Sequence, residues 1–172
     1  MEANFEKQVG EQYPRIMEGI GRVALAASFL EFAVDQLGWF LTGDLQAYRA
    51  LTRGISISSK ADRLVQLAKH IITDEELEQR IATFLKGTKP LLEQRNRSIH
   101  SLYSEEDDGV IQFEFLKDTH VRNVDAEEFF ALAEKIWGSL VPIDALTHDL
   151  RQYMNEQKLA LQSMVNATPA TL

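Results

Sequence analysis

The stretch that decides the fold is PRIMEGIGRVALAASFLEFAVDQLGWFL, residues 14–41. Its apolar side chains recur every three to four residues, which is the spacing of one face of a helix. They are Ile16, Ile20, Val23, Leu25, Ala27, Leu30, Val34, Leu37 and Leu41. The spacing predicts one long amphipathic helix from about Pro14 to Leu41. The turn residues 42–44 indicate its end, and Asp44 is placed to cap a short helix that ends near Gly54.

Two further helical stripes follow. The second main helix is expected over residues 60–72, directly after Ser58 and Ser59. Residues 73–76, TDEE, have the form of a capping box, which predicts the start of a third main helix. That helix meets GTKP at residues 87–90, where the proline removes a backbone donor. We expect a kink or a restart at this point.

The next segment changes periodicity. The turn cluster SEEDDG, residues 104–109, precedes VIQFEF, residues 110–115, in which apolar and polar residues alternate. This alternation predicts a short β-hairpin. Asp125 is then placed to cap a last long helix, in which Pro142 is a second point for a kink.

The bulk numbers indicate one globular domain. The chain has 172 residues, of which 45% are hydrophobic and 26% charged. We therefore predict an all-α fold, an antiparallel bundle of four main helices plus a minor helix, with a short β-hairpin insert after the third main helix. The domain is expected over residues 1–165, and residues 166–172 are expected to form a flexible tail.

The composition excludes several classes of site. Cysteine is absent, which removes disulfides, zinc-thiolate sites and thiol catalysis. Gly-rich phosphate loops, nucleophile elbows and paired-histidine metal motifs are missing too, so no cofactor and no metal is predicted. The N-terminus lacks the form of a secretory signal, and no 18 consecutive residues are all apolar. We expect a cytoplasmic protein with no membrane span.

Charge is distributed unevenly along the chain. The net charge of −8 argues against nucleic-acid binding, because phosphate contacts require Lys and Arg. Between Arg80 and His100, however, five basic residues stand against one acidic residue, a local balance of +4. This segment is a basic island in an acidic protein.

The basic island contains RNRSIHS, residues 95–101. An Arg with a His five places later is weak evidence by itself, but here Asn96 directly follows Arg95 on a helix that carries core residues. At about 100° per residue, Asn96 and His100 share one face, whereas Arg95 and His100 point about 140° apart. Either the Arg95 side chain wraps around the helix, or a second copy of the helix completes the site across a two-fold axis.

The segment EQRNRSIHSLY, residues 93–103, resembles the signature of the HEPN superfamily, which is Arg, a polar residue such as Asn, about three further residues, then His. The order of elements is similar as well: a long first helix, the motif late in the third helix, a variable insert and a closing amphipathic helix. One departure is Ser101, where many relatives carry Gly after the His.

The resemblance implies metal-independent RNA cleavage at a homodimer cleft, in a toxin–antitoxin or phage-defence context with an antitoxin protein as a further partner. His100 would be the base for a ribose 2′-OH or the acid for the leaving oxygen, since an imidazole exchanges protons near neutral pH. Arg95 would stabilise charge on the phosphate oxygens. Asn96 would orient the imidazole or hold a phosphate oxygen.

Four further residues are candidates for supporting roles. Arg97, Lys89 and Lys86 would attract the RNA backbone, with a plain solvated role as the alternative. Glu31 lies in the apolar first helix, and either is exposed or faces the cleft and holds Arg95. The acidic run at 105–108 would repel RNA if it leaned over the cleft.

Two other functions stay open at this point. The same helix is consistent with a non-catalytic helical dimerisation or protein-interaction module, whose acidic surface binds a basic partner. The nucleotide-binding half of the family name suggests a HEPN domain that binds a nucleotide without cutting RNA.

Overall fold

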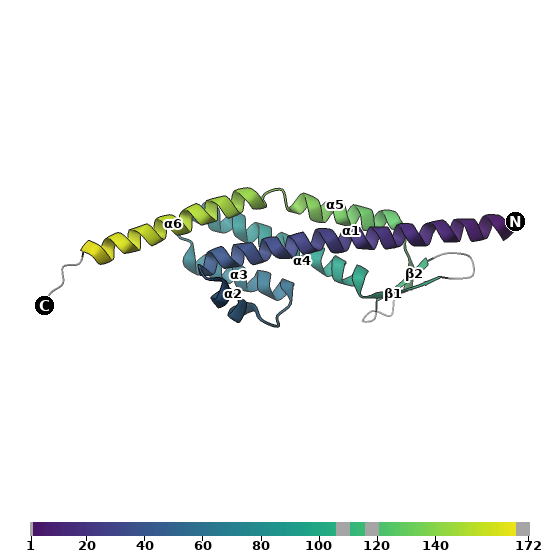
Figure 1. Cartoon of the computed structure of the whole chain (residues 1–172), viewed down its shortest axis with the longest axis horizontal. Coiled ribbons are helices and arrows are strands. Elements are labelled where there is room, and N and C mark those ends of the chain that lie inside the picture. The colour runs from purple at the N-terminus through teal and green to yellow at the C-terminus, as the bar shows by residue number, and fades with distance from the viewer. Residues whose placement is uncertain (1, 106–110, 116–120, 168–172) are drawn as a thin grey trace. The chain divides into compact units, whose positions relative to one another are not determined.

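The computed structural model describes the backbone of residues 2–105, 111–115 and 121–167, and the side chains of residues 13–100 and 124–163. The elements in chain order are α1 (Glu2–Thr42), α2 (Leu45–Thr52), α3 (Ile57–Ile71), α4 (Glu75–Ile99), β1 (Ser101–Glu105), β2 (Ile111–Phe115), β3 (Val121–Asn123), α5 (Ala126–Ser139) and α6 (Ile143–Ala167) (Figure 1). The described chain is predominantly helical, as the hydrophobic periodicity predicts.

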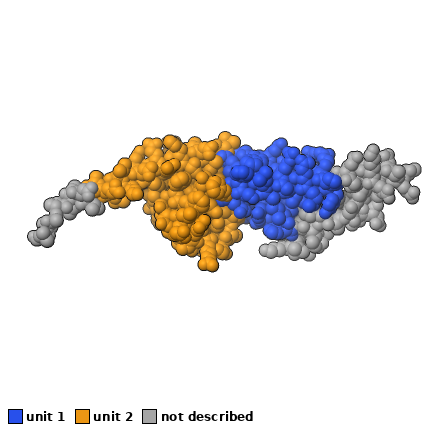
Figure 2. Space-filling model, viewed as in Figure 1, with its two compact units in different colours: residues 1–31, 87–140 blue, residues 32–86, 141–172 orange. Residues whose placement is uncertain are grey.

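The chain forms two compact units (Figure 2). Unit 1 comprises residues 1–31 and 87–140, and unit 2 comprises residues 32–86 and 141–172. Helices α1 and α4 each contribute one part to either unit. The antiparallel arrangement of four main helices over the whole chain stays a prediction, because each unit is defined by its own contacts.

Helix α4 continues through Pro90, so the expected restart at this proline does not occur. Helix α1 also runs through Pro14 and starts at Glu2, whereas the spacing predicted a start near Pro14. Leu85 and Leu92 are both fully buried, before and after Pro90. Their packing stabilises the helix across the single backbone hydrogen bond that the proline removes.

Helix caps set two of the starts as predicted. The Asp44 carboxylate accepts a hydrogen bond from the Ala47 N–H at 2.8 Å, which begins α2. The Asp125 carboxylate accepts from the Glu127 N–H at 3.2 Å, which begins α5. In both cases a short acidic side chain satisfies a backbone donor that the first helical turn leaves unpaired.

Two other helices begin one to three residues from the predicted positions. Helix α3 is capped by Ser56, and Ser58 and Ser59 lie inside its first turn. Helix α4 is capped by Asp74, which accepts from the Leu77 N–H at 3.0 Å, and not by Thr73. Thr73 instead donates its N–H to the Tyr153 hydroxyl at 2.9 Å. A tertiary contact therefore overrides the local capping box.

The predicted last long helix is two helices. α5 ends at Ser139, and α6 begins at Ile143, directly after Pro142. The Pro142 carbonyl accepts the Leu146 N–H at 3.0 Å, so the proline precedes the first turn of α6, where a missing N–H costs nothing. α6 includes residues 166–167 of the predicted tail, and residues 168–172 lie outside the described residues.

The described strands form one antiparallel sheet in the order β1-β2-β3, where the alternation predicted a two-stranded hairpin. Ser101 pairs with Phe115 and Glu105 with Ile111, so β1 follows the end of α4 almost immediately. Gln112 pairs with Asn123, which adds β3 on the other side of β2.

Each unit has its own buried side chains. Unit 1 buries residues of α1, α4 and α5, namely Ile16, Val23, Ala26, Ala27, Leu30, Leu92, Phe129, Leu132, Ala133 and Ile136. Unit 2 buries, among others, Val34, Leu37, Leu41, Tyr48, Leu64, Ala68, Ile81, Leu85, Leu146 and Leu150. Most of the predicted stripe of α1 is therefore core. Leu25 is an exception, because it is 55% exposed and lies on the opposite side of the helix.

Residues Tyr13–Thr42 of α1 are long and apolar enough to cross a membrane by length and composition, since an 18-residue window within them has a mean hydropathy of 1.3. Core helices of soluble proteins and signal sequences share this property. The expected absence of a membrane span stays a prediction.

Candidate functional site at the end of helix α4

The predicted motif lies at the C-terminal end of α4. Arg95 and Asn96 lie in its last turns, and His100 follows the last helical residue, Ile99. The backbone N–H of His100 donates to the carbonyl of Asn96 at 3.0 Å, so helical hydrogen bonding extends to His100. Asn96 and His100 are therefore one turn apart on the same face, as the spacing predicts.

Two groups hold the Arg95 guanidinium. Its Nη1 donates to Asn96 Oδ1 at 2.8 Å, and its Nη2 lies 3.5 Å from Oε1 of Glu31 on α1. The side chains of Arg95 and Glu31 are 22% and 35% exposed, so water only partly screens this ion pair. Of the two alternatives for Glu31, the structure shows the contact with Arg95, and the position of Glu31 at a cleft stays a prediction.

One hydrogen-bond donor of the Arg95 guanidinium has no partner among the described residues. The Nε–H of Arg95 is buried and has no hydrogen-bond partner in the described part of the chain. A buried donor without a partner is unfavourable by about 1–3 kcal/mol. Such groups are uncommon and tend to mark sites where something other than folding selects the side chain.

His100 has an exposed side chain at the end of α4. The contacts of Arg95 within the described residues are those with Asn96 and Glu31, and neither reaches His100. The Arg95 side chain thus does not wrap around the helix to the imidazole. Within one chain, the guanidinium and the imidazole are separate groups that Asn96 links through its side chain and its carbonyl.

The three predicted RNA-binding cations divide between the units. Lys89 and Arg97 belong to unit 1 with Arg95, whereas Lys86 belongs to unit 2. Lys89 is half-buried and Arg97 is exposed. Lys89, Asn96 and His100, at spacings of seven and four residues, share one face of α4 over about 16 Å. That face offers one positive charge, one amide and one imidazole in a row.

The acidic run cannot be placed against this site. Glu105 is the last residue of β1, and residues 106–108 lie outside the described residues. The prediction that this run restrains RNA binding stays a prediction.

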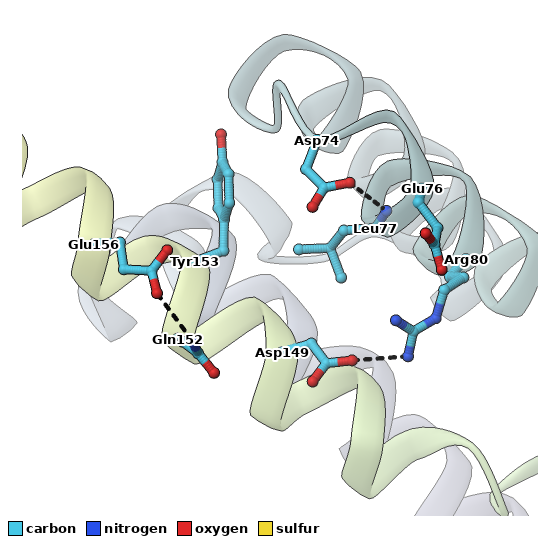
Figure 3. Close-up of a pocket in the computed structure, with 8 residues that line it drawn as sticks. All are labelled: Asp74, Glu76, Leu77, Arg80, Asp149, Gln152, Tyr153 and Glu156. Atoms are coloured by element: carbon cyan, nitrogen blue, oxygen red, sulfur yellow. Dashed lines mark hydrogen bonds and ion pairs between the residues drawn. The ribbon is translucent and has the colours of Figure 1, made fainter.

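Unit 2 contains a polar cavity that sequence reasoning missed (Figure 3). It has a volume of about 280 Å³ and is lined by Asp74, Glu76, Leu77, Arg80, Asp149, Gln152, Tyr153 and Glu156. Arg80 on α4 and Asp149 on α6 point toward each other in the close-up and form an ion pair at 2.8 Å. In the described ranges no group of three His, Asp or Glu side chains is placed to hold a metal ion.

A second cavity of unit 2 has a volume of about 560 Å³. Its lining residues come from α1, α2, α3 and the loop between α2 and α3, and are Asp35, Trp39, Tyr48, Arg49, Thr52, Arg53, Gly54, Ile55 and Lys60. Three of these side chains are cationic. Residues 45–61 contain these three basic residues and no acidic residue, which is one local signal in the sequence. A second signal is the four-residue spacing of Arg49 in α2 and Arg53 at its C-cap.

Comparison with protein families, with curated proteins and with solved structures finds no match to this chain.

Proposed function

We propose that this protein is a homodimeric endoribonuclease of the HEPN type that cleaves RNA without a metal ion. One observation carries the proposal. Glu31 and Asn96 hold the half-buried guanidinium of Arg95, and His100, one turn after Asn96, has an exposed imidazole. An oriented cation and an exposed imidazole are the two groups that phosphodiester cleavage requires. Cytoplasmic location, a toxin–antitoxin or defence context and an antitoxin partner belong to the same proposal.

In the proposed reaction, neutral His100 accepts the proton of a ribose 2′-OH. The 2′ oxygen forms a bond to phosphorus while the bond from phosphorus to the 5′ oxygen of the next nucleotide breaks. The leaving oxygen takes its proton from a solvent water molecule. Arg95 donates to the phosphate oxygens, where negative charge accumulates in the transition state. The products are a 2′,3′-cyclic phosphate and a 5′-hydroxyl.

The geometry of one chain supports the proposal that a second chain completes the site. Arg95 and His100 make no contact with each other, so one subunit presents them as separate groups. A two-fold axis beside α4 would bring the guanidinium of one subunit to the imidazole of the other.

An exposed apolar face supports self-association. Leu25, Phe29 and Trp137, all in unit 1, are 55%, 49% and 41% exposed. The rings of Phe29 on α1 and Trp137 on α5 have centroids 5.1 Å apart. Exposed apolar side chains that are already packed against one another are typical of a protein–protein contact surface.

The test is digestion of RNA in the presence of a metal chelator. Wild-type protein is expected to cleave RNA and leave cyclic phosphate ends, and Arg95→Ala or His100→Ala is expected to abolish cleavage while circular dichroism stays unchanged. His148→Ala and Arg151→Ala, which replace exposed residues of α6, are the matched controls and should retain activity. Full activity of both site variants would refute the proposal.

Mixing the two inactive variants tests whether the site is shared. If Arg95 of one subunit acts with His100 of the other, a heterodimer of the two variants contains one intact site out of two. Random exchange of subunits then restores about a quarter of wild-type activity. If both groups act within one subunit, no intact site forms and the mixture stays inactive.

The second candidate function is a non-catalytic interaction module. The same apolar face of Leu25, Phe29 and Trp137 favours it, because this face is as suitable for contact with another protein as for contact with a second copy of this chain. An inactive wild-type protein that is dimeric, and that binds a basic protein without cutting RNA, would support this function.

A further inference from the structure

The larger cavity of unit 2, called the cationic cavity after Arg49, Arg53 and Lys60, is lined by residues of unit 2 only, and the proposed catalytic residues belong to unit 1. We propose that this cavity binds a small organic phosphate that carries a planar ring, such as a nucleoside monophosphate. The proposal is independent of the proposed ribonuclease activity. The charges, the aromatic side chain and the volume of the cavity support it.

The charges match a phosphate monoester. The lining contains three cationic side chains, Arg49, Arg53 and Lys60, and one carboxylate, Asp35. Its net charge is therefore +2. A phosphate monoester carries about −1.5 to −2 at neutral pH. In a chain with a net charge of −8, a cavity with this positive charge is a selective place for an anion.

The arginines have charges that the protein does not neutralise. Arg49 and Arg53 are exposed, and neither forms an ion pair or a side-chain hydrogen bond within the described residues. They are four residues apart at the end of α2, where like charges repel each other. An anion between the two guanidinium groups would turn this repulsion into two charge-assisted contacts.

Lys60 and the loop complete the cationic wall. Lys60 Nζ lies 3.0 Å from Asp35 Oδ1, so α3 holds its ammonium at the cavity. Gly54 has a φ of +74°, a conformation that glycine adopts without strain, and it turns the chain between α2 and α3. Arg53 before this turn and Lys60 after it therefore line the same space.

The aromatic side chain supplies a surface for a ring. Trp39 lines the cavity and is half-buried, and its indole packs edge-to-face against Phe32 with centroids 5.9 Å apart. A fixed indole is a good stacking surface for a heteroaromatic base. The volume of about 560 Å³ lies within the range of about 300–1,000 Å³ that is usual for small-molecule sites.

Intrinsic fluorescence reports on this cavity. The chain has two tryptophans, so Trp137→Phe leaves Trp39 as the only indole. Titration of this variant with AMP is expected to quench the fluorescence saturably, and calorimetry of the wild-type protein should give the same affinity. Arg49→Ala and Arg53→Ala are each expected to weaken AMP binding about tenfold, the cost of one charge-assisted hydrogen bond. Arg151→Ala, on an exposed part of α6, is the matched control and should bind AMP like the wild type.

Three probes separate the parts of the ligand. Ribose 5-phosphate lacks the ring and adenosine lacks the phosphate, so both should bind at least tenfold more weakly than AMP. A 5′-phosphorylated trinucleotide distinguishes two sources of the ligand. If it binds more tightly than AMP, the ligand is the 5′ end of a nucleic-acid strand. If it binds more weakly than AMP, the ligand is a free nucleotide. The proposal is wrong if AMP causes no saturable change at millimolar concentration, if the two arginine variants bind AMP like the wild type, or if ribose 5-phosphate binds as tightly as AMP.

Discussion

Glu31 Oε1 lies 3.5 Å from Arg95 Nη2, and this ion pair joins α1 to the predicted catalytic turn of α4. Because both side chains are partly exposed, the pair contributes little to stability, about 1 kcal/mol or less. Its expected role is to orient the guanidinium. We predict that Glu31→Gln lowers kcat for RNA cleavage about tenfold, with a small change in KM and in the free energy of unfolding.

The matched control is Glu18→Gln. Glu18 accepts from Arg22 Nη2 at 2.7 Å on the exposed face of the same helix, so its replacement also removes one ion pair from α1. Kinetics of both variants under chelating conditions give the comparison. Equal kcat values for the two variants would show that Glu31 has no positioning role.

Glycine has opposite roles at two neighbouring positions of α1. A Cβ at Gly19 would lie 2.7 Å from the Cβ of buried Phe129, whereas a Cβ at Gly21 would have no atom within 4 Å. Gly19→Ala should therefore destabilise the protein by about 1–3 kcal/mol, because α5 must move away from α1. Gly21→Ala should stabilise it by up to about 1 kcal/mol through helix propensity.

Denaturant unfolding of the two variants gives this comparison directly. The two substitutions are chemically identical and two residues apart, so the difference between their free energies of unfolding isolates the packing of α1 against α5. A destabilisation of similar size in both variants would contradict the close approach at Gly19.

The Tyr48 hydroxyl donates a hydrogen bond to Asp35. Burial of the phenol is the larger cause that raises the pKa of Tyr48 well above its usual range, and the Asp35 carboxylate is the second cause. The folded state therefore keeps a proton that the unfolded state loses above about pH 10. This contribution to stability is complete below that pH and is lost as the pH rises further. We predict that the free energy of unfolding falls less steeply above about pH 10 in Tyr48→Phe than in the wild type.

The measurement is a series of denaturant titrations on either side of that pH, with tyrosinate absorbance as a direct probe of the phenol. Asp35→Asn is the companion variant, because it keeps the burial of Tyr48 and removes the negative charge. For Asp35→Asn, the slope of the free energy of unfolding against pH above about pH 10 should lie between those of the wild type and Tyr48→Phe. Identical slopes in all three proteins would contradict the raised pKa.

Local sequence signals predicted the parts of the fold that depend on a few neighbouring residues. Asp44 and Asp125 cap helices as expected, because a short acidic side chain satisfies a backbone donor within its own turn. Asn96 and His100 share a face because helical geometry alone fixes that relation. Local signals left a kink and a restart open at Pro90, and α4 continues without a restart, since packing of distant residues decides whether a proline breaks a helix.

Features assembled from several elements were beyond local signals. The contact of Glu31 with Arg95 was one of two alternatives, because helical phase alone did not decide between exposure and the ion pair. The cationic cavity joins Arg53 to Lys60 across a turn and to Trp39 of another helix. A count of charge along the chain does not bring Trp39 to these two cations, because Trp39 is uncharged and lies on another helix.

The exposed pair of Phe29 and Trp137 gives the last prediction. If the apolar face of unit 1 is the contact between two copies, Phe29→Asp places a charge in a desolvated interface. Removal of a central aromatic contact typically costs about 2 kcal/mol or more, so the dissociation constant of the dimer should rise about 30-fold or more. Sedimentation measures this change, and RNA cleavage should fall with the fraction of dimer.

Leu159→Asp is the control for a surface charge elsewhere, because Leu159 is 65% exposed on α6 of unit 2. It should leave both the dimer and RNA cleavage unchanged. A Phe29→Asp protein that remains dimeric and active would assign the two-fold contact to another surface. A monomeric protein that still cleaves RNA would show instead that Arg95 and His100 of one chain suffice, which is the arrangement that the contacts of Arg95 argue against.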